Sequence, residues 1–234
     1  MPTITQQPLV TSSKNKTPPQ RKQRGGGLWF VLLFLVVFGL VFLSFFQREE
    51  PVEEEPAATA TAPEAKWLTP WIEPQILEVD GDSRRGEKLE AVRNIVVHYV
   101  GNPGTTAKAN RNWFANPESD TSSHFIVGLE GEVIQCIPLN EKSSATNERN
   151  SDTISVEVCH PDESGKFSEV TRKSLIRLLT WLCEKYDFDE ESLIRHYDVT
   201  GKKCPLYYVE NEEEWLLLKS DVKRALEGEI LWEE

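Results

Sequence analysis

The sequence predicts an α/β fold class, with a mixed central β-sheet flanked by helices and preceded by a single transmembrane helix. Two patterns predict the folded part: short apolar runs typical of strands intermix along the chain with segments whose apolar residues recur at helical spacing. A third observation is a run of nineteen residues, 28–46, without a charge. The chain has 234 residues, 39% hydrophobic and 27% charged, which suits one globular domain with appendages.

The N-terminal segment predicts a membrane anchor. Residues 1–27 contain five basic residues, no acidic one and much Pro, Gln, Ser and Thr, so we expect a disordered basic tail. At about 1.5 Å per residue, residues 28–46 are long enough to cross the lipid bilayer as a helix. Because basic residues precede this run and glutamates follow it, the N-terminus is expected in the cytoplasm and the rest outside the cell membrane.

Two alternatives to an uncleaved anchor remain. A cleaved signal peptide has an apolar stretch of about 7–15 residues that ends near a small-residue site. Here the run is longer, and the small residues of 58–62 lie more than ten residues beyond it. A buried core helix is disfavoured because no amphipathic face can be drawn on residues 28–46.

The remaining chain divides into a tether and a folded domain. Residues 47–66 are rich in Glu, Pro, Ala and Thr and predict an extended acidic tether. Residues 67–234 hold 19 Lys and Arg against 32 Asp and Glu, a net charge of −13. This charge excludes nucleic acid as a partner, since binding to phosphates requires a basic surface. It also disfavours electrostatic adhesion to an anionic surface. We therefore expect the membrane anchor, and not charge, to determine where the domain is held.

The elements of the domain follow from local patterns. Residues 67–93 look irregular, with a short helical candidate around Lys88, and residues 94–100 form an apolar strand that ends at a Gly- and Pro-rich turn. Alternation places His98 on the face of this strand that also carries Asn94 and Val96. The further expected elements are a helix over 107–116, a hairpin of 122–128 and 132–137, a strand over 153–158, and helices over 169–186 and 212–226.

Two of these elements carry specific expectations. In the strand 153–158, Ile154 and its alternate neighbours face a core, which puts Glu157 on the other side. The helix 169–186 has Ser168 as its expected N-cap and leucines at helical spacing.

A candidate zinc site links two distant parts of the domain. His196 and Cys204 lie in one short loop, in which Gly201 and Pro205 allow the backbone to double back. His98, at a strand end, is the third candidate ligand. Two imidazole nitrogens and one thiolate leave the fourth tetrahedral position of Zn²⁺ open for water, which is the arrangement of a catalytic site.

Acid–base groups beside such a zinc outline an amide hydrolysis. Glu157 is positioned to take a proton from water, and Lys202 or Lys203 to stabilise an oxyanion. Taken singly, each residue has a plainer interpretation: a hydrogen-bonded core histidine, a solvated strand carboxylate or a surface lysine. If Cys204 is a ligand, three cysteines remain, and an odd number cannot all form disulfides. Cys183 lies in a helical apolar pattern and is expected in the core. Cys136 and Cys159 are both expected at strand ends, and the sequence does not show whether they pair.

Four ordered motifs carry a family resemblance. They are IVVHYVGNPG from residue 95, SSHFIV at 122–127, ISVEVC at 154–159 and HYDVTGKKCP at 196–205. Together they resemble the zinc-dependent N-acetylmuramoyl-L-alanine amidases of the type 2 family, which is related to phage lysozyme-like amidases and peptidoglycan recognition proteins. The resemblance covers about residues 84–209.

The resemblance implies roles for individual residues. His98, His196 and Cys204 match the zinc ligands, although some members have Asp in place of the Cys. Glu157 matches the acidic residue that acts on water, and Lys202 matches the catalytic lysine, whereas Lys203 has no counterpart.

The second motif departs from the pattern of some relatives. They carry a catalytic Tyr at the position of Ser123, and because they often lack the strand Glu, Glu157 is expected to take over this role. Ser123 and His124 are candidate substrate contacts, with support of the fold as the alternative role for His124. His160 is expected at the surface.

The expected function is hydrolysis of the amide between the lactyl group of N-acetylmuramic acid and L-alanine of peptidoglycan, outside the membrane. One alternative is a module of the same fold that binds peptidoglycan or muropeptide without cutting it, as zinc-free relatives that lack the Cys ligand do. A scaffold that docks a protein partner is a weaker alternative, because no stretch of the sequence selects a partner.

Overall fold

The computed structural model describes residues 69–79, 81–116, 118–230 and 232. The expected tail, membrane helix and tether at 1–27, 28–46 and 47–66 lie outside these residues. Among the residues described, no helix combines the length and apolarity that a bilayer crossing requires.

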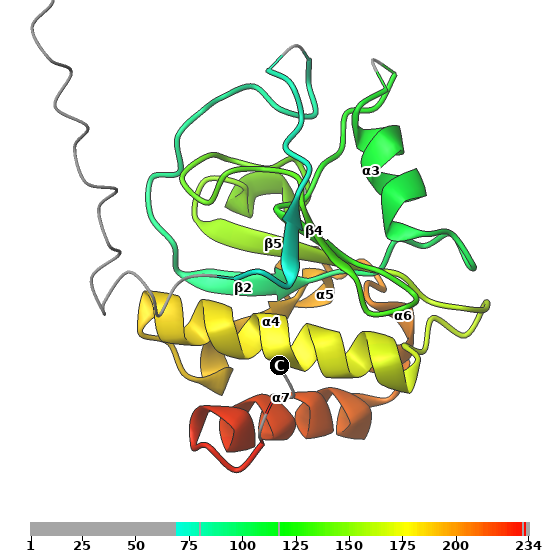
Figure 1. Cartoon of the computed structure of the whole chain (residues 1–234), viewed down its shortest axis with the longest axis vertical. Coiled ribbons are helices and arrows are strands. Elements are labelled where there is room, and N and C mark those ends of the chain that lie inside the picture. Colours follow the sequence, from blue (N-terminus) through cyan, green and yellow to red (C-terminus); the bar gives the residue numbers. More distant parts are fainter. Residues whose placement is uncertain (1–68, 80, 117, 231, 233–234) are drawn as a thin grey trace, which may run out of the picture. The chain divides into compact units, whose positions relative to one another are not determined.

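A six-stranded sheet forms the centre of the domain (Figure 1). Its strands are β1 (Ile72–Pro74), β2 (Asn94–Val97), β3 (Phe125–Val127), β4 (Val133–Gln135), β5 (Thr153–Val158) and β6 (Leu193–Arg195). The order in the sheet is β1-β4-β3-β5-β2-β6. Among the described strands, the β3–β4 hairpin alone is antiparallel, and the other neighbouring strands run parallel. The predicted mixed sheet is therefore confirmed.

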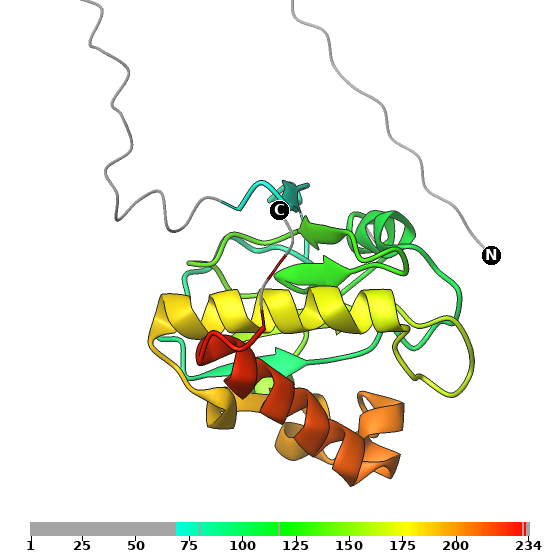
Figure 2. The same ribbon diagram turned by 60° about the horizontal axis from the view of Figure 1, so that its bottom comes forward.

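Helices cover both faces of this sheet (Figures 1 and 2). On one face α4 (Glu169–Tyr186) and α7 (Glu212–Leu226) pack on a large apolar core that includes Ile95, Ile154 and Val156. On the other face α3 (Ala107–Phe114) packs on a smaller core with Ile126 and Ile134. The short elements η1 (Asn147–Arg149), η2 (Glu190–Ser192), α5 (His196–Thr200) and α6 (Leu206–Glu210) lie in the connections.

The two long helices have the bounds that the sequence predicted. Ser168 caps α4 because its side chain accepts a hydrogen bond from the backbone N–H of Thr171 at 3.2 Å, and Leu175, Leu178 and Leu179 are fully buried. Trp215 anchors α7 in the same core. The stretch 153–158 is also a strand, with Ile154 in the core as expected.

Other expectations were wrong or incomplete. Lys88 is not helical and forms an isolated bridge to Glu141. The stretch 67–93, expected to be irregular, contains β1, a three-residue edge strand that needs β4 as its partner. His160 is 1% exposed rather than at the surface, because its ring packs against Tyr99 with the centroids 5.0 Å apart.

All four cysteines are buried, and none forms a disulfide within the described part of the chain. Cys136 follows β4 and Cys159 follows β5, and β3 separates these two strands in the sheet. Cys183, a residue of α4, lies in the core as predicted.

Candidate metal centre and active site

The candidate site lies at the carboxyl ends of three neighbouring parallel strands, the usual ligand position of an open α/β sheet. At this end of the sheet, Val97 of β2 pairs with Val156 of β5 on one side and with Arg195 of β6 on the other. One residue further along each strand are Glu157, His98 and His196. Strand alternation therefore presents all three side chains on one face, in one row across β5, β2 and β6.

Cys204 reaches this row because the chain turns back after α5. Gly201 ends the helix with a left-handed φ of 76°, a conformation that glycine adopts without a steric penalty. The backbone N–H of Tyr197 then donates to the carbonyl of Cys204 at 3.0 Å. The residues from His196 to Cys204, expected to be a loop, thus begin with a short helix and then fold back on it.

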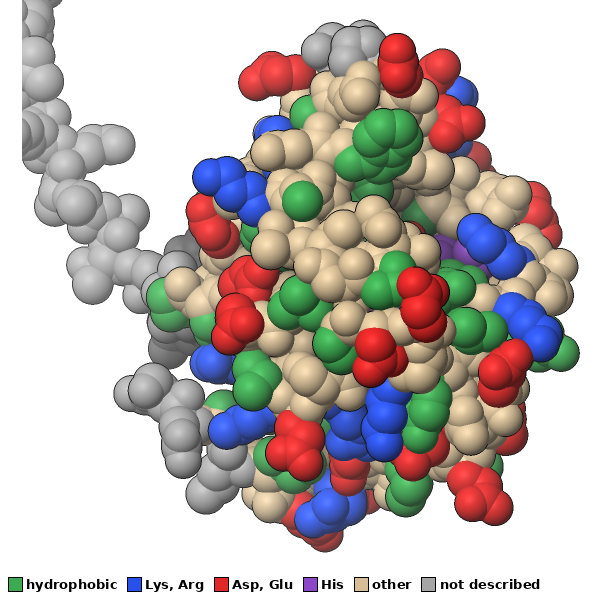
Figure 3. All heavy atoms as spheres, turned by 90° about the vertical axis from the view of Figure 1, so that its right-hand side faces the viewer, with side chains coloured by type: hydrophobic (Ala, Val, Ile, Leu, Met, Phe, Trp, Pro, Cys, Tyr) green, Lys and Arg blue, Asp and Glu red, His purple; other side chains and the backbone are tan. Residues whose placement is uncertain are grey.

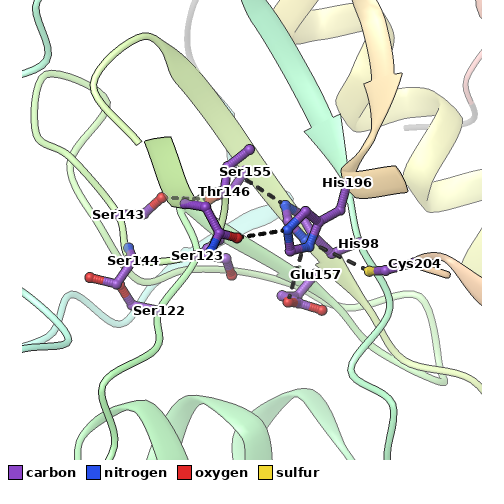
Figure 4. Close-up of polar contacts among 12 residues, drawn as sticks. His98, Ser122, Ser123, Ser143, Ser144, Thr146, Ser155, Glu157, His196 and Cys204 are labelled. Carbon is purple, nitrogen blue, oxygen red and sulfur yellow. Dashed lines mark hydrogen bonds and ion pairs between the residues drawn. The ribbon is translucent and has the colours of Figure 1, made fainter. Parts of the chain in front are cut away.

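The three candidate ligands converge in the structure (Figure 4). One donor atom from each of His98, His196 and Cys204 lies within 4.8 Å of the other two. The Sγ of Cys204 is 3.8 Å from Nδ1 of His98, and the two imidazole centroids are 4.7 Å apart. With ligand distances of about 2.0–2.3 Å, tetrahedral zinc separates its donors by roughly 3.3–3.8 Å, so a small contraction closes the set around one ion.

The second ring nitrogen of each histidine is already engaged, and this supports the fit. Nε2 of His98 lies 3.3 Å from the hydroxyl of Thr146, and Nε2 of His196 lies 2.9 Å from Oδ1 of Asn147. Nδ1 of His196 is buried and has no hydrogen-bond partner among the described residues. A buried nitrogen without a partner is costly unless something binds it, and a metal ion between the three residues would do so.

The protonation states match a metal site. Burial lowers the pKa of His98 well below its usual value and also lowers the pKa of His196, so both rings are neutral and keep a lone pair. Burial raises the pKa of the Cys204 thiol to about 12 in the metal-free protein. A bound cation would favour the thiolate and release its proton.

Glu157 places a buried carboxyl beside the donor set. Its Oε1 lies 4.0 Å from Nδ1 of His98, and its Oε2 is buried with no hydrogen-bond partner in the part of the chain that the structure describes. Burial raises the pKa of Glu157 to about 8, against the opposing charge of Lys202. A carboxyl that titrates near neutral pH is suited to take up and release a proton.

Lys202 and Lys203 have different environments. Lys202 lines the cavity that contains the donor set. Lys203 instead forms an ion pair with Glu210, with Nζ and Oε1 2.8 Å apart, on the outer surface.

A cavity of about 260 Å³ opens above the donor set. Its walls include Tyr99, Asn110, Trp113 and Thr121, and the side chain of Trp113 is exposed. Figure 3 shows a histidine surface at the bottom of a hollow, with a basic side chain at the rim. The sequence did not indicate Trp113, because an aromatic residue in a helical pattern is usually part of a core.

Ser123 and His124, the candidate substrate contacts, are not among the residues that line this cavity. Both are fully buried. The ring of His124 is held between the hydroxyl of Ser155 at 3.1 Å and the carbonyl of Glu141 at 2.9 Å. The hydroxyl of Ser123 donates to the carbonyl of Phe125 at 2.7 Å. Both side chains therefore bond to strands and loops of the domain. For His124 these contacts fit the alternative role, support of the fold.

The fold and the site place the chain in the class of α/β proteins with a candidate metallohydrolase centre. Within this class, the family described as N-acetylmuramoyl-L-alanine amidase matches residues 88–206, half of the chain, and the chain belongs to this family. The four motifs had predicted this membership.

Curated relatives and solved structures agree with this assignment. The chain is 31% identical over 173 residues to the N-acetylmuramoyl-L-alanine amidase BlyA of Bacillus subtilis strain 168, covering 65% of this chain and 47% of that protein. It is 29% identical over 167 residues to the amidase CwlL of Bacillus licheniformis, covering 64% and 46%. The chain thus matches about half the length of these relatives. A mutant endolysin from Bacillus subtilis has the same fold, with a TM-score of 0.57, 24% identity and coverage of 64% and 97%.

Proposed function

We propose that the domain is a zinc amidase that cleaves peptidoglycan between the lactyl group of N-acetylmuramic acid and L-alanine. The observation that carries the proposal is the convergence of His98, His196 and Cys204 beside the buried carboxyl of Glu157, at the floor of a cavity. The relatives named as N-acetylmuramoyl-L-alanine amidases support this substrate.

His98, His196 and Cys204 would hold the ion, and when bound, zinc supplies a Lewis acid that activates water and polarises a carbonyl. Glu157 accepts the proton of the attacking water and passes it to the leaving amine of L-alanine. Burial beside the donor set raises the pKa of this carboxyl and favours its uptake of a proton. The ammonium of Lys202, on the cavity wall, stabilises negative charge on the amide oxygen.

The test is digestion of purified sacculi followed by mass spectrometry. An amidase exposes the free amine of L-alanine and leaves the glycan chain intact, whereas a glycosidase or an endopeptidase leaves other ends. We expect Glu157→Ala and Cys204→Ala to retain the fold, measured by circular dichroism, and to release no stem peptide. Release by either variant at the rate of the unaltered protein would contradict the mechanism. Binding of sacculi by the unaltered protein without release would identify a binding module instead.

We further propose that residues 28–46 anchor the domain to the outer face of the cell membrane. The nineteen uncharged residues and the basic-to-acidic change across them support this proposal. In this arrangement residues 1–27 are the cytoplasmic tail, residues 47–66 are the tether, and residues 67–234 are the amidase domain. The anchor would keep an acidic domain close to peptidoglycan despite the lack of electrostatic attraction.

A further inference from the structure

The polar turn between β4 and β5 contacts both candidate histidine ligands from the side opposite the proposed ion. Thr146 and Asn147 are consecutive residues of this turn, and each approaches the Nε2 of a different histidine: Thr146 that of His98 at 3.3 Å, and Asn147 that of His196 at 2.9 Å. Thr146 is fully buried. Neither residue belongs to a motif that the sequence pattern singles out.

The chemistry of these contacts fixes which nitrogen of each ring keeps a lone pair. The amide oxygen of Asn147 can only accept a hydrogen bond, so Nε2 of His196 carries the hydrogen and Nδ1 does not. A hydroxyl can accept as well, and the hydroxyl of Thr146 has no other partner within the described structure. When Nε2 of His98 donates to it, Nδ1, the nitrogen nearest Cys204, is also free to bind a cation.

The turn is built to hold these two oxygens in place. Asn147 adopts a left-handed conformation with φ 54°, which asparagine tolerates better than most residues. The side-chain oxygen of Asn150 accepts the backbone N–H groups of Ala145 at 3.1 Å and Thr146 at 2.7 Å. Arg149 donates to Oδ1 of Asn94 at 2.8 Å, and Asn94 begins the strand that ends beside His98.

We infer that Thr146 and Asn147 are positioning residues that select the metal-binding tautomer and orientation of both histidines. This inference rests on the proposed zinc site. Groups that hold the second nitrogen of a ligating histidine typically change metal affinity by about 10–100-fold when removed. Thr146 and Asn147 are adjacent in the chain and contact different imidazole rings. A displacement of this turn would therefore remove the hydrogen bonds of both candidate ligands at once.

The experiment measures zinc affinity of the full-length protein by competition with a chromophoric chelator, independently of activity. Thr146→Val removes the hydroxyl at nearly constant volume, and Asn147→Gly removes the amide while keeping the left-handed backbone accessible. We expect each to weaken zinc binding by about 10–100-fold. Thr146→Ser and Asn147→Asp retain an acceptor oxygen. Their zinc affinity is expected to stay within about threefold of that of the unaltered protein, a change smaller than the ~10–100-fold loss.

Two further measurements separate positioning from a general loss of structure. Metal-free thermal unfolding should be similar for Asn147→Gly and Asn147→Asp, and the cobalt-substituted absorption spectrum should change only where the acceptor is lost. If the unaltered protein binds zinc and all four variants bind it equally, the inference is overturned. If the unaltered protein binds no zinc, the proposed metal centre is overturned and the inference with it.

Discussion

Glu157 has an environment that favours a neutral carboxyl in the metal-free protein. One of its oxygens is buried without a partner, and the side chain is 19% exposed. An unfolded chain returns this carboxyl to water, where its pKa falls from about 8 to the ordinary value of 4.5. The two states therefore bind different numbers of protons between these values, and stability depends on pH there.

The first prediction concerns Glu157→Gln in the metal-free protein. Below pH 4.5 the carboxyl is protonated in both states and contributes no pH dependence. As the pH rises to about 8, the unfolded state releases the proton that the folded state still holds, so the unaltered protein loses stability. Glutamine cannot ionise, and we expect its Tm to exceed that of the unaltered protein by roughly 5–10 °C at pH 8. Calorimetry at pH 4.5 and pH 8 measures the difference in Tm between the variant and the unaltered protein. The same difference at both pH values would contradict the prediction.

The second prediction separates the two adjacent lysines. Lys202→Met should lower kcat roughly 10²–10³-fold with little change in KM, because its ammonium acts on charge that develops during the reaction. Lys203→Met is the matched control. Its ammonium pairs with Glu210 at the surface, and such pairs contribute little. Steady-state release of stem peptide measures both, and equal losses would show that the loop, not one ammonium, is required.

At the scale of elements, the β3–β4 hairpin packs closely on the start of α4. Gly131 in its turn has φ 83°, and a Cβ placed there would lie 2.7 Å from Oγ of Ser174 and 2.9 Å from Cγ1 of Val170. Gly228, after α7, has a similar φ of 79° but nothing within 4 Å of such a Cβ.

The third prediction uses this pair of glycines. Gly131→Ala and Gly228→Ala impose the same backbone strain, about 1–2 kcal/mol. Only Gly131→Ala also forces the hairpin away from α4, which should cost a further ~1–3 kcal/mol of unfolding free energy. Urea denaturation of both variants measures the difference. Equal destabilisation would mean that the hairpin moves aside without cost.

The elements that the sequence predicted best are those with a strong local signal. The helix over 169–186 has a capping serine and a stripe of leucines, so its bounds follow from nearby residues. In contrast, β1 has three residues and exists because β4 lies beside it. The turn at Thr146 was not predictable as part of the site, because its contacts with the histidines span about fifty residues of sequence.

At the scale of the whole molecule, the fourth prediction concerns residues 28–46. The full-length chain should remain with membranes after carbonate extraction, because a run of nineteen uncharged and mostly apolar residues favours the bilayer. Replacing Val36 and Val37 together by Arg costs about 2.5–3.5 kcal/mol each and should move the protein to the soluble fraction. The double replacement by Leu is the control and should stay with the membrane. Extraction of the unaltered chain by carbonate would contradict an integral anchor.

The composition of the candidate site was predictable, but its assembly was not. Local spacing linked His196 to Cys204, and strand alternation singled out His98 and Glu157, to which the family motifs then gave roles. The row that these residues form depends on the order β5-β2-β6, and local patterns do not specify which strands become neighbours.

This strand order has a consequence for the stage of folding at which the proposed zinc ion would bind. His98 is synthesised 106 residues before Cys204, and the sheet brings them together only after β2 has gained β5 and β6 as neighbours. A local Cys-x-x-Cys motif can capture an ion on an unfolded chain. Here only His196 and Cys204 are close in sequence, and His98 joins them after long-range strand pairings, which form slowly. Metal uptake would therefore follow completion of the sheet, and a chain whose last strand failed to dock would retain only His98 beside the carboxyl of Glu157.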